Sequence, residues 1–564
     1  MCAQTATWAQ EEEKPEPGKS VLVMVPMRDG VKLATEVEIP PGPKKRMPVV
    51  LLRTPYGRSL GGALSLFRGF VGGGYILVSQ DTRGRFDSEG ENLPFMTGQE
   101  DGYDTVEWIA SQPWSDGRVG MIGGSALGIT GYQAAIAAPP HLDCVLAVVA
   151  PANLQSQAIL WGGQMRKDLA IGWTVGTGYP VEALTLMTDH AFYDDFAKKY
   201  DLAFNAQNVR TPMMHIGGWY DIFNQGTIAA FLALQENGGE GARGLQRLIM
   251  GPWTHGGMIG RKQGELEFPS NSTMNPMLSS ILNWNNKCVE GNLKEVELPV
   301  QFYMMGDVDK TDTRWNVWKK SATWPPPGGI SETWNLTPDK SLTTSTPAES
   351  KSFTYTFDPS NPVKTMGGGN LTIGTHGSVD QRKIENRPDV LVFDSPVFEE
   401  PYGIAGPVYT ELTVSTTGCD TDFTAKLTDV YPDGRSMLIA DGIARTSFRE
   451  YDQGHLVPAE KDQKMRICIY AGDTAHTFNK GHKMRLAVSS SNHPRFSVNT
   501  NTCGQDAFSH TLIEAEYEDA KTAKKKNWSP THDSVPFEIV KNTVYTGGAD
   551  TSTLILPWFD LEKE

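Results

Sequence analysis

Short apolar segments recur through the first half of the chain and alternate with segments of helical periodicity. Six of them have the length of a buried strand: residues 48–52, 75–79, 119–122, 145–149, 213–216 and 248–250. Strands that alternate with helices are typical of a mostly parallel sheet with helices on both faces. The pattern therefore predicts an α/β fold in this half of the chain, in two parts at residues 20–153 and 209–327.

The segment between these two parts has a helical pattern. From residue 154 to residue 208, large apolar side chains recur about one helical turn apart, at Trp161, Met165, Leu169 and Trp173. We predict a helical insertion here. By itself, such a stripe more often packs into a core than contacts a ligand.

A different pattern begins near residue 331. Short β-branched and aromatic runs are broken by Gly, Pro, Asn and Asp, and they fall at residues 390–393, 408–414, 423–430, 437–439, 466–470 and 484–488. Such spacing is typical of a β-sandwich. We predict a separate all-β domain at residues 331–564, joined by a linker at residues 324–329, WPPPGG.

Polar residues directly follow several of the predicted strands. Ser125, Asp221 and His255 each come within a few residues of the end of an apolar run. Parallel sheets place their functional groups just beyond the carboxyl ends of the strands. We therefore expect a functional site at this edge of the sheet.

Ser125 lies in the sequence RVGMIGGSALGITGY, residues 118–132. The apolar run ends in Gly123 and Gly124, and a helix-competent segment follows the serine. A serine on a sharp turn between strand and helix is the nucleophile elbow of α/β-hydrolases. The usual G-x-S-x-G pattern would place glycine at Leu127, whereas this chain has Gly128. The motif alone is thus equally consistent with an ordinary turn.

The order of residues in the chain favours catalysis over that alternative. Serine, then aspartate, then histidine is the order in which α/β-hydrolases carry their catalytic triad. Among the eleven histidines, His255 is the one that follows a strand-like run after Asp221. Taken singly, Asp221 reads as a helix cap and His255 as a polar loop residue. Together with Ser125 they predict a Ser-His-Asp triad that works through an acyl-enzyme.

Composition and charge exclude several other classes of protein. The formal net charge of −15 argues against nucleic acid or an anionic membrane as a partner. No apolar stretch is long enough to span a membrane. The six cysteines lack zinc-site spacing and the HExxH motif is absent, so we expect no metal and no cofactor. The remaining partner is a small-molecule substrate, and the oligomeric state stays open.

The first residues bear on localisation. The opening MCAQTATWAQEEE resembles the tail of a secretory signal, because small residues precede Gln10. The charged and strongly apolar parts of such a signal are not present. We expect a periplasmic or secreted enzyme, with the cytoplasm as the alternative.

Several further segments resemble the CocE/NonD hydrolases, a family of serine esterases and acylases related to the X-prolyl dipeptidyl peptidases. They are VPMRDGVKL, LLRTPYGR, QDTRGRFDSEG, WSDGRVGMIGGS, GGWYDIF, MGPWTHG, TDFTAKLTDVYPDG and SSSNHPRFSVNTNT. The resemblance runs from about Val21 to the end of the chain.

This resemblance implies an α/β-hydrolase domain with an inserted helical cap and a C-terminal jelly-roll β-sandwich. It also implies an oxyanion hole made by the Tyr56 phenol and the backbone N–H of Ala126, which fits the need for two donors at a developing negative charge. Without the resemblance, Tyr56 reads as a turn residue that packs beside its neighbouring proline. The cap of this family lines the acyl pocket, to which we assign Trp161, Trp173, Trp219 and Phe223.

Two departures from the family bear on the substrate. The family usually has tyrosine after the nucleophile, whereas this chain has Ala126, which predicts a differently shaped acyl pocket. The α-amino-acid ester hydrolases have acidic residues just after the triad aspartate, where this chain has Phe223 and Asn224. Acidic residues of the insertion offer an alternative ammonium site but read more readily as solvated helix charges: Asp168, Asp189, Asp194 and Asp195.

The sequence therefore predicts a serine hydrolase of carboxylic esters, with activated amides as further substrates. The alternatives are an α-amino-acid ester hydrolase or β-lactam acylase, an X-prolyl dipeptidyl peptidase, an acyltransferase, and an inactive ligand-binding protein. The sequence leaves open the natural acyl and leaving groups.

Overall fold

The computed structural model describes residues 16–42, 45–59, 74–310, 312, 314–450, 454–502, 513–514, 516–518, 521 and 536–562. The chain forms two compact units. The first unit comprises Met1–Ala147, Asn208–Pro212 and Ser280–Leu293, and the second comprises Val148–Gln207, Met213–Ser279 and Lys294–Glu564.

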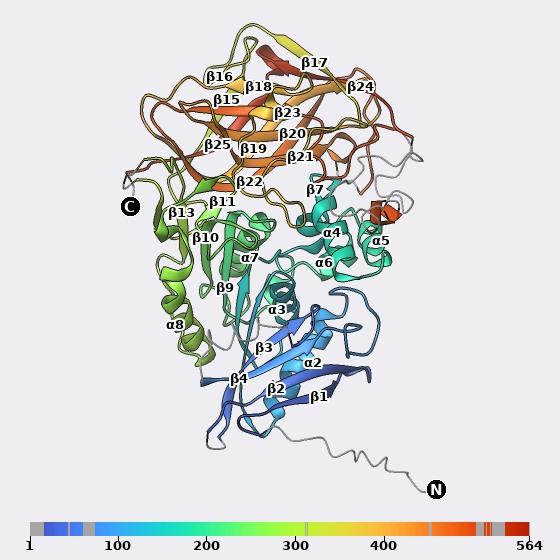
Figure 1. The fold of residues 1–564 in the computed structure, drawn as a ribbon, viewed down its shortest axis with the longest axis vertical. Coiled ribbons are helices and arrows are strands. Elements are labelled where there is room, and N and C mark those ends of the chain that lie inside the picture. The colour runs from blue at the N-terminus through green and yellow to red at the C-terminus, as the bar shows by residue number, and fades with distance from the viewer. Residues whose placement is uncertain are drawn as a thin grey trace. The chain divides into compact units, whose positions relative to one another are not determined.

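A mixed sheet with helices forms the first unit (Figure 1). Its strand order is β1-β2-β4-β3-β5-β6. Strand β2 is antiparallel to both of its neighbours, β1 and β4, and β3 is parallel to both β4 and β5. The strands are β1 Ser20–Pro26, β2 Lys32–Glu38, β3 Met47–Thr54, β4 Ile76–Asp81, β5 Ser115–Gly124 and β6 Leu142–Val148. The helices are α2 Gly98–Ser111, α3 Ala126–Ile136 and α8 Leu278–Val289. Helix α3 packs against α2 and β5.

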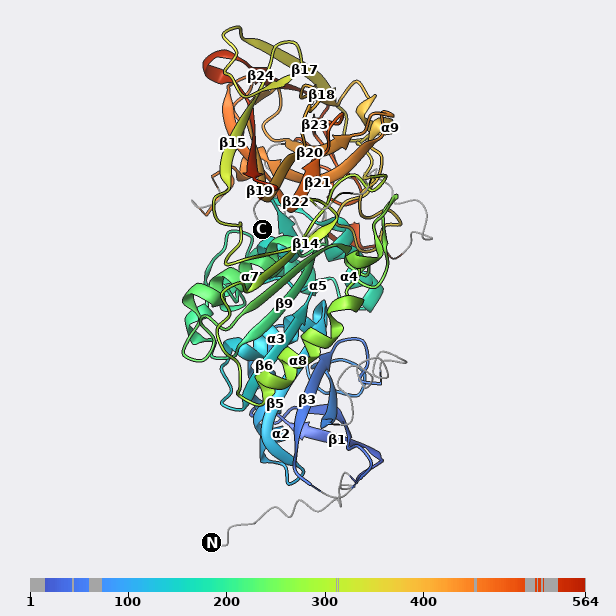
Figure 2. The ribbon, with the colours of Figure 1, turned by 90° about the vertical axis from the view of Figure 1, so that its left-hand side faces the viewer.

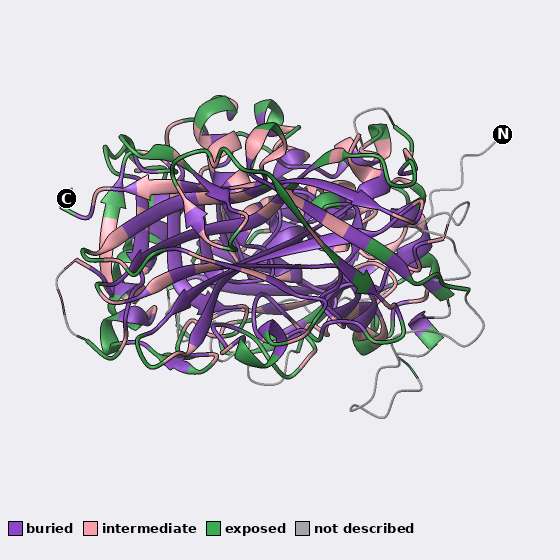
Figure 3. Ribbon diagram, turned by 90° about the horizontal axis from the view of Figure 1, so that it is seen from above, coloured by how far each residue is buried: buried purple, intermediate pink, exposed green. Residues whose placement is uncertain are grey.

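Burial explains which strands lie inside the sheet. All six residues of β4 are buried, as expected for a parallel strand covered on both faces. Strand β1 instead alternates between buried and exposed residues, which is typical of a strand with one solvated face. In Figure 3 the strands are mostly buried, whereas exposed residues gather in loops and on outward helix faces.

The second unit begins with a helical segment and a further part of the α/β fold. The strands β9 Met213–Tyr220, β10 Arg247–Thr254 and β13 Val300–Met304 are parallel neighbours, and β14 Val317–Ser321 is antiparallel to β13. Helix α7, Asn224–Asn237, packs against β9 (Figures 1 and 2). Two short pairs complete this part: β11 Lys262–Gln263 with β12 Leu266–Glu267, and β7 Leu160–Trp161 with β8 Gln164–Met165.

Helices fill the chain between β8 and β9, as the periodicity predicts. They are α4 Lys167–Thr177, α5 Glu182–Asp189 and α6 Asp195–Lys199, preceded by the π-helical turn Gln155–Ile159. Leu160, Ile171 and Leu184 share a small hydrophobic core in this segment, to which Tyr517 of the C-terminal part also belongs. The Tyr517 hydroxyl donates to the Tyr179 carbonyl at 2.7 Å.

The C-terminal part of the second unit is an all-β domain, as predicted. One sheet has the order β16-β15-β25-β19-β24-β17, with β22 paired to β19, and the other has the order β18-β23-β20-β21. The strands are β15 Ile330–Leu336, β16 Leu342–Thr343, β17 Lys351–Phe357, β18 Leu391–Asp394, β19 Tyr402–Thr416, β20 Asp422–Val430, β21 Ser436–Arg445, β22 Met465–Phe478, β23 Lys483–Ser489, β24 Val540–Thr546 and β25 Thr553–Phe559. The domain also contains the short helix α9, Arg382–Glu385.

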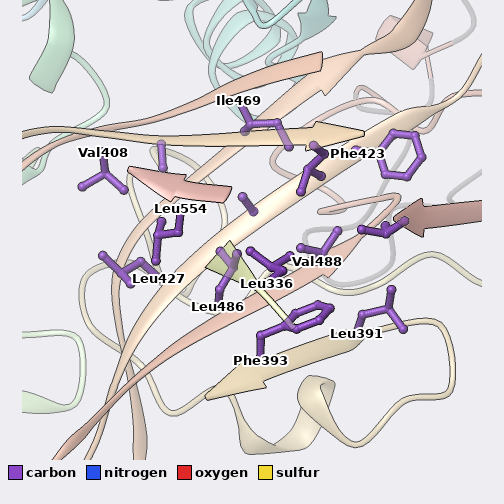
Figure 4. Close-up of a cluster of buried hydrophobic side chains, with 14 of the residues drawn as sticks. Leu336, Leu391, Phe393, Val408, Phe423, Leu427, Ile469, Leu486, Val488 and Leu554 are labelled. Carbon is purple, nitrogen blue, oxygen red and sulfur yellow. The ribbon is translucent and has the colours of Figure 1, made fainter. Parts of the chain in front are cut away.

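Side chains from both of these sheets form a single hydrophobic core (Figure 4). Leu554 comes from the larger sheet, whereas Phe423 and Leu486 come from the smaller one. All three are buried. The two sheets are thus held together by apolar burial, which is the main source of stability for such a domain.

A buried histidine joins the segment that follows strand β13 to the all-β domain. The His482 Nδ1 lies 2.8 Å from Asp429, its Nε2 lies 3.3 Å from Asp307, and His476 Nε2 lies 3.2 Å from Asp429. The His482 ring also packs on the Tyr431 ring, with 4.4 Å between their centroids. Burial lowers the pKa of His482, but the two carboxylates outweigh it and raise the pKa to about 9.

This arrangement predicts that the contribution of His482 to folding stability is lost at alkaline pH. Because the folded-state pKa of His482 lies above its ordinary value of about 6.5, its contribution is complete below that pH and disappears as the pH rises through about 9. The expected result is that His482→Gln lowers the thermal midpoint most at about pH 6 and least above pH ~10. Thermal unfolding of both proteins over this range measures it. A midpoint difference that does not change with pH would contradict the assignment.

Candidate active site

Ser125 occupies a strained turn between β5 and α3 in the first unit. Its φ is +57° and its ψ is −124°, a backbone conformation that residues other than glycine rarely adopt. The Ser125 carbonyl accepts the first helical hydrogen bond, from Ile129 at 3.0 Å. This is the geometry of a nucleophile elbow, so the structure confirms the strand, turn and helix predicted around Ser125.

The structure also explains the departure from the G-x-S-x-G pattern. Leu127 is buried where the pattern has glycine, and a Cβ on Gly123 would lie 2.5 Å from the Leu127 Cβ and carbonyl carbon. Since real Cβ atoms do not approach so closely, residue 123 must be glycine for the elbow to form. The turn thus keeps its shape with a large side chain at position 127.

The predicted oxyanion donors belong to the same unit. Strands β3 and β5 are parallel neighbours with Leu51 paired to Met121, so their carboxyl ends lie at one edge of the sheet. Tyr56 follows β3, is half-buried, and has its backbone N–H bonded to the Thr54 hydroxyl at 3.0 Å. Ala126 is the first residue of α3, where backbone N–H groups have no partner within the helix.

Asp221 and His255 form a hydrogen-bonded pair in the second unit. The register of the parallel strands β9 and β10 pairs Tyr220 with Thr254. The next residues along each strand, Asp221 and His255, are therefore neighbours. The His255 Nδ1 lies 2.7 Å from Asp221 Oδ2. The other carboxylate oxygen, Oδ1, accepts the Phe223 backbone N–H at 2.7 Å. Asp221 therefore serves both as a turn residue and as the partner of the imidazole.

The surroundings of this pair restrict its motion. The Asp221 side chain is fully buried, and that of His255 is 15% exposed. The Phe223 ring meets the imidazole edge to face, with 5.6 Å between centroids. Glycine at 218 lets the two strands approach, because a Cβ there would lie 2.1 Å from the Trp253 carbonyl oxygen. The imidazole is thus held in one orientation by a carboxylate and an aromatic ring.

The tryptophans assigned to a pocket lie in different surroundings. Trp161 is buried, stacks on Tyr470 at 5.7 Å, and lines a cavity of about 1120 Å³ within the second unit. Trp173 is partly exposed and packs on Tyr179 at 5.2 Å. Trp219 lies in the core, where its indole N–H donates to the Tyr303 carbonyl at 2.8 Å and its ring stacks on Trp324.

The acidic residues of the insertion divide into two kinds. Asp189, Asp194 and Asp195 are exposed, as expected for solvated helix charges. Asp168 differs from that expectation, because it is 1% exposed and its carboxylate accepts hydrogen bonds from the loop at residues 371–373. The expectation of a solvated charge at Asp168 was wrong, since the sequence contains no sign of this distant loop.

Asn224 is the first residue of helix α7 and follows the turn that carries Asp221. Its amide donates to the Trp219 and Asp473 carbonyls at 3.1 and 2.9 Å, and its side-chain oxygen accepts the Asp473 N–H at 3.2 Å. These bonds tie the start of α7 to strand β22. The side chain therefore holds backbone groups and carries no charge.

In the described part of the chain, no helix is long and apolar enough to cross a membrane. The residues of that part also contain no group of three or more His, Cys, Asp and Glu side chains placed to hold a metal ion. The Asp420-Thr421-Asp422 turn has its carboxylates bound to Arg445, Asn499 and Gln164.

Comparisons with known proteins identify the relatives of this chain. Residues 29–185 and 180–257 match the X-Pro dipeptidyl-peptidase (S15 family), and residues 293–555 match the X-Pro dipeptidyl-peptidase C-terminal non-catalytic domain. Cocaine esterase of Rhodococcus sp. (strain MB1 Bresler) is 32% identical over 551 residues, which cover 86% of this chain and 92% of that protein.

Solved structures show the same fold. An α-amino acid ester hydrolase superposes with a TM-score of 0.78 at 24% identity, covering 99% of this chain and 100% of that one. A CocE/NonD family hydrolase from Staphylococcus aureus superposes with a TM-score of 0.69 at 18% identity, covering 96% of this chain and 94% of that one. The fold is thus an α/β-hydrolase-like S15 fold with a mixed sheet and a C-terminal all-β domain.

These findings define a serine hydrolase of the S15 type. The chain belongs to the CocE/NonD family. It is an enzyme that hydrolyses carboxylic esters, and its substrates are small molecules.

Proposed function

We propose that ester hydrolysis by this chain proceeds through an acyl-enzyme on Ser125, with His255 as the general base and acid and Asp221 as its partner. The hydrogen bond between His255 Nδ1 and Asp221, 2.7 Å long, is the observation that carries the proposal. The elbow conformation of Ser125, the Ser-Asp-His chain order and the family membership support it.

The proposed bond changes involve the ester, water and these side chains. The Ser125 hydroxyl oxygen bonds to the ester carbonyl carbon while its proton passes to His255 Nε2, since Nδ1 is committed to Asp221. The imidazolium then protonates the departing alkoxide, which leaves as an alcohol. Water, deprotonated by the same imidazole, attacks the acyl-enzyme and releases the carboxylic acid and the free serine.

The test of this proposal combines turnover with covalent labelling. The enzyme is expected to cleave p-nitrophenyl esters and to lose that activity on reaction with a fluorophosphonate, which attacks activated serines. Turnover that survives complete exposure to the reagent would contradict the proposal. A chain that neither reacts nor cleaves any ester would be the inactive ligand-binding protein considered above.

We further propose that Tyr56 and the Ala126 N–H form the oxyanion hole. Two observations support this proposal. Strands β3 and β5 end at the same edge of the sheet, and Ala126 is the first residue of α3. A phenol and a helix N-terminal N–H are both donors suited to a developing negative charge.

Replacing one of these donors gives a quantitative prediction. Tyr56→Phe is expected to lower kcat for p-nitrophenyl esters by roughly 100- to 1000-fold, because it removes one hydrogen bond made chiefly in the transition state. KM should change little. Steady-state kinetics measure both constants, and Tyr103→Phe, a change at a tyrosine of helix α2, is the matched control. A kcat within about threefold of the wild type would assign Tyr56 to turn packing instead.

The preferred substrates are proposed to be esters whose acyl group carries no α-ammonium. The uncharged side chains of Phe223 and Asn224, and the loop-bound carboxylate of Asp168, support this preference. An ester panel that pairs each α-aminoacyl ester with its des-amino counterpart tests it, with cocaine included because of the relative's name. Faster cleavage of the α-aminoacyl esters would favour the α-amino-acid ester hydrolase reading.

The architecture proposed for these roles follows the family. Residues 154–208 would form a cap that contributes Trp161 and Trp173 to an acyl pocket, which Phe223 of the turn after Asp221 would also line. The all-β domain would be a jelly roll. The helices α4 to α6 and the two sheets with one core support these assignments. The core position of Trp219 favours a structural role for that residue.

Export is the localisation that we propose. Cys419 takes part in a disulfide, and disulfides persist mainly in oxidising compartments. Expression in the native host followed by fractionation tests the proposal. Recovery of all activity from the cytoplasm would contradict it.

A further inference from the structure

The loop at residues 367–373 of the all-β domain contacts the turn that carries Asp221. A Cβ on Gly369 would lie 3.0 Å from the Asp221 carbonyl oxygen, so the backbones of loop and turn are in close contact. Leu371 packs against the hydrophobic cluster that contains Ile222 and Phe223. Any displacement of this loop therefore acts on the residues next to the catalytic carboxylate.

A buried carboxylate from helix α4 holds this loop. Asp168 accepts the backbone N–H groups of Leu371, Thr372 and Ile373, the last two at 2.8 Å, and the Thr372 hydroxyl at 2.6 Å. Hydrogen bonds to an ionised acceptor are about twice as strong as neutral ones. With a cluster of donors around one buried carboxylate, the loop has a single favourable position.

A buried guanidinium holds the turn from another direction. Arg166 is 1% exposed, and it donates to the Ile222 carbonyl at 2.7 Å and to the Gln157 carbonyl. Its guanidinium lies 5.2 Å from the Trp161 ring centroid. The residue directly after Asp221 is thus bonded to the same chain segment that carries Asp168.

We infer that Asp168 and Arg166 are positioning residues for the Asp221–His255 pair, an inference that rests on the proposed function. They clamp the turn at residues 221–223 between the helical segment and the loop at residues 367–373. The clamped turn orients Asp221, because the Phe223 N–H donates to Asp221 Oδ1 at 2.7 Å. It also places the Phe223 ring against the His255 imidazole. Neither residue touches the reacting atoms.

The clamp explains why the all-β domain bears on catalysis although it supplies no residue of the proposed triad. Loosening the loop would let Asp221 and His255 shift together without leaving one another. A displacement of about 1 Å at such a site is enough to lower a rate by roughly 100-fold. The expected signature is a lower kcat with an unchanged KM, since the imidazole acts on the reacting atoms and not on substrate binding.

Asp168→Asn tests this, because the amide keeps the size of the side chain but faces backbone donors with its own N–H groups. The matched control is Asp420→Asn. Asp420 is a second buried carboxylate, and it accepts the Ser447 N–H and the Thr446 hydroxyl, each at 3.0 Å, in a part of the all-β domain away from residues 367–373. We expect Asp168→Asn to lower kcat roughly 10- to 100-fold with KM unchanged. Asp420→Asn should keep the wild-type kcat even if its thermal midpoint falls.

The outcomes separate the clamp from general destabilisation. Wild-type kcat in Asp168→Asn, or an equal loss of kcat in Asp420→Asn at the same folded fraction, would overturn the clamp. If Asp168→Asn does not fold, Thr372→Val removes one donor to Asp168 without changing any charge, and a kcat equal to that of the wild type would overturn it as well. Ser125→Ala in the same series tests the proposed function separately, because a retained activity there contradicts the triad whatever Asp168→Asn does.

Discussion

Ser125→Ala is expected to reduce ester hydrolysis by about 10⁴-fold or more, because the variant has no hydroxyl to form the acyl-enzyme. Binding and the oxyanion donors would still give a small residual rate. The variant should fold as the wild type does, since Ser125 caps no helix through its side chain. Cleavage of p-nitrophenyl esters and a thermal unfolding curve measure the two effects.

The control for this experiment is a serine of the same unit. Ser111 is exposed at the end of helix α2, and its hydroxyl donates a hydrogen bond to the Trp108 carbonyl within that helix. Ser111→Ala should therefore hydrolyse esters at the wild-type rate. A Ser125→Ala variant as active as this control would remove Ser125 from the mechanism.

Asp221→Asn is expected to lower kcat by about 10⁴-fold with little change in KM. The carboxylate fixes the proton on His255 Nδ1 and stabilises the imidazolium, whereas an amide presents an N–H group that favours the wrong tautomer. Steady-state kinetics from pH 5 to pH 9 measure the loss. The buried site excludes compensation by solvent, because the Asp221 side chain is fully buried.

A surface aspartate provides the matched change for this variant. Asp195→Asn makes the same substitution in helix α6, where the side chain is fully exposed and pairs only loosely with Lys198 at 3.3 Å. Its kcat should equal that of the wild type. If Asp221→Asn loses less than about tenfold, the carboxylate is a turn residue and not a catalytic partner.

Six strands of the α/β part were predictable because each contains a continuous apolar run, whereas the parallel strand β13 was missed. A strand buried on both faces leaves a continuous apolar run in the sequence, and all six predicted runs lie in or overlap strands of the structure: β3, β4, β5, β6, β9 and β10. Strands β1 and β2 were missed, because their alternating residues resemble an ordinary surface segment. In the all-β domain, β15, β17, β24 and β25 were also missed, because their apolar residues form a weaker local pattern.

The candidate site divides in a similar way. The position of Ser125 on a strained turn follows from local glycines, and the pairing of Asp221 with His255 follows from the register of two adjacent strands. The clamp at Asp168 was not predictable, because its partners lie about 200 residues away in a loop without regular structure. The core position of Trp219 depends on Tyr303 and Trp324, which lie about 80 to 110 residues further along the chain.

The nucleophile itself is tested most directly by locating the covalent adduct. The wild-type enzyme is treated with a fluorophosphonate, digested, and mapped by mass spectrometry. We expect one adduct, on the peptide that contains Ser125, formed in step with the loss of ester hydrolysis and absent from Ser125→Ala. An adduct on another residue that accompanies the loss of activity would contradict this expectation.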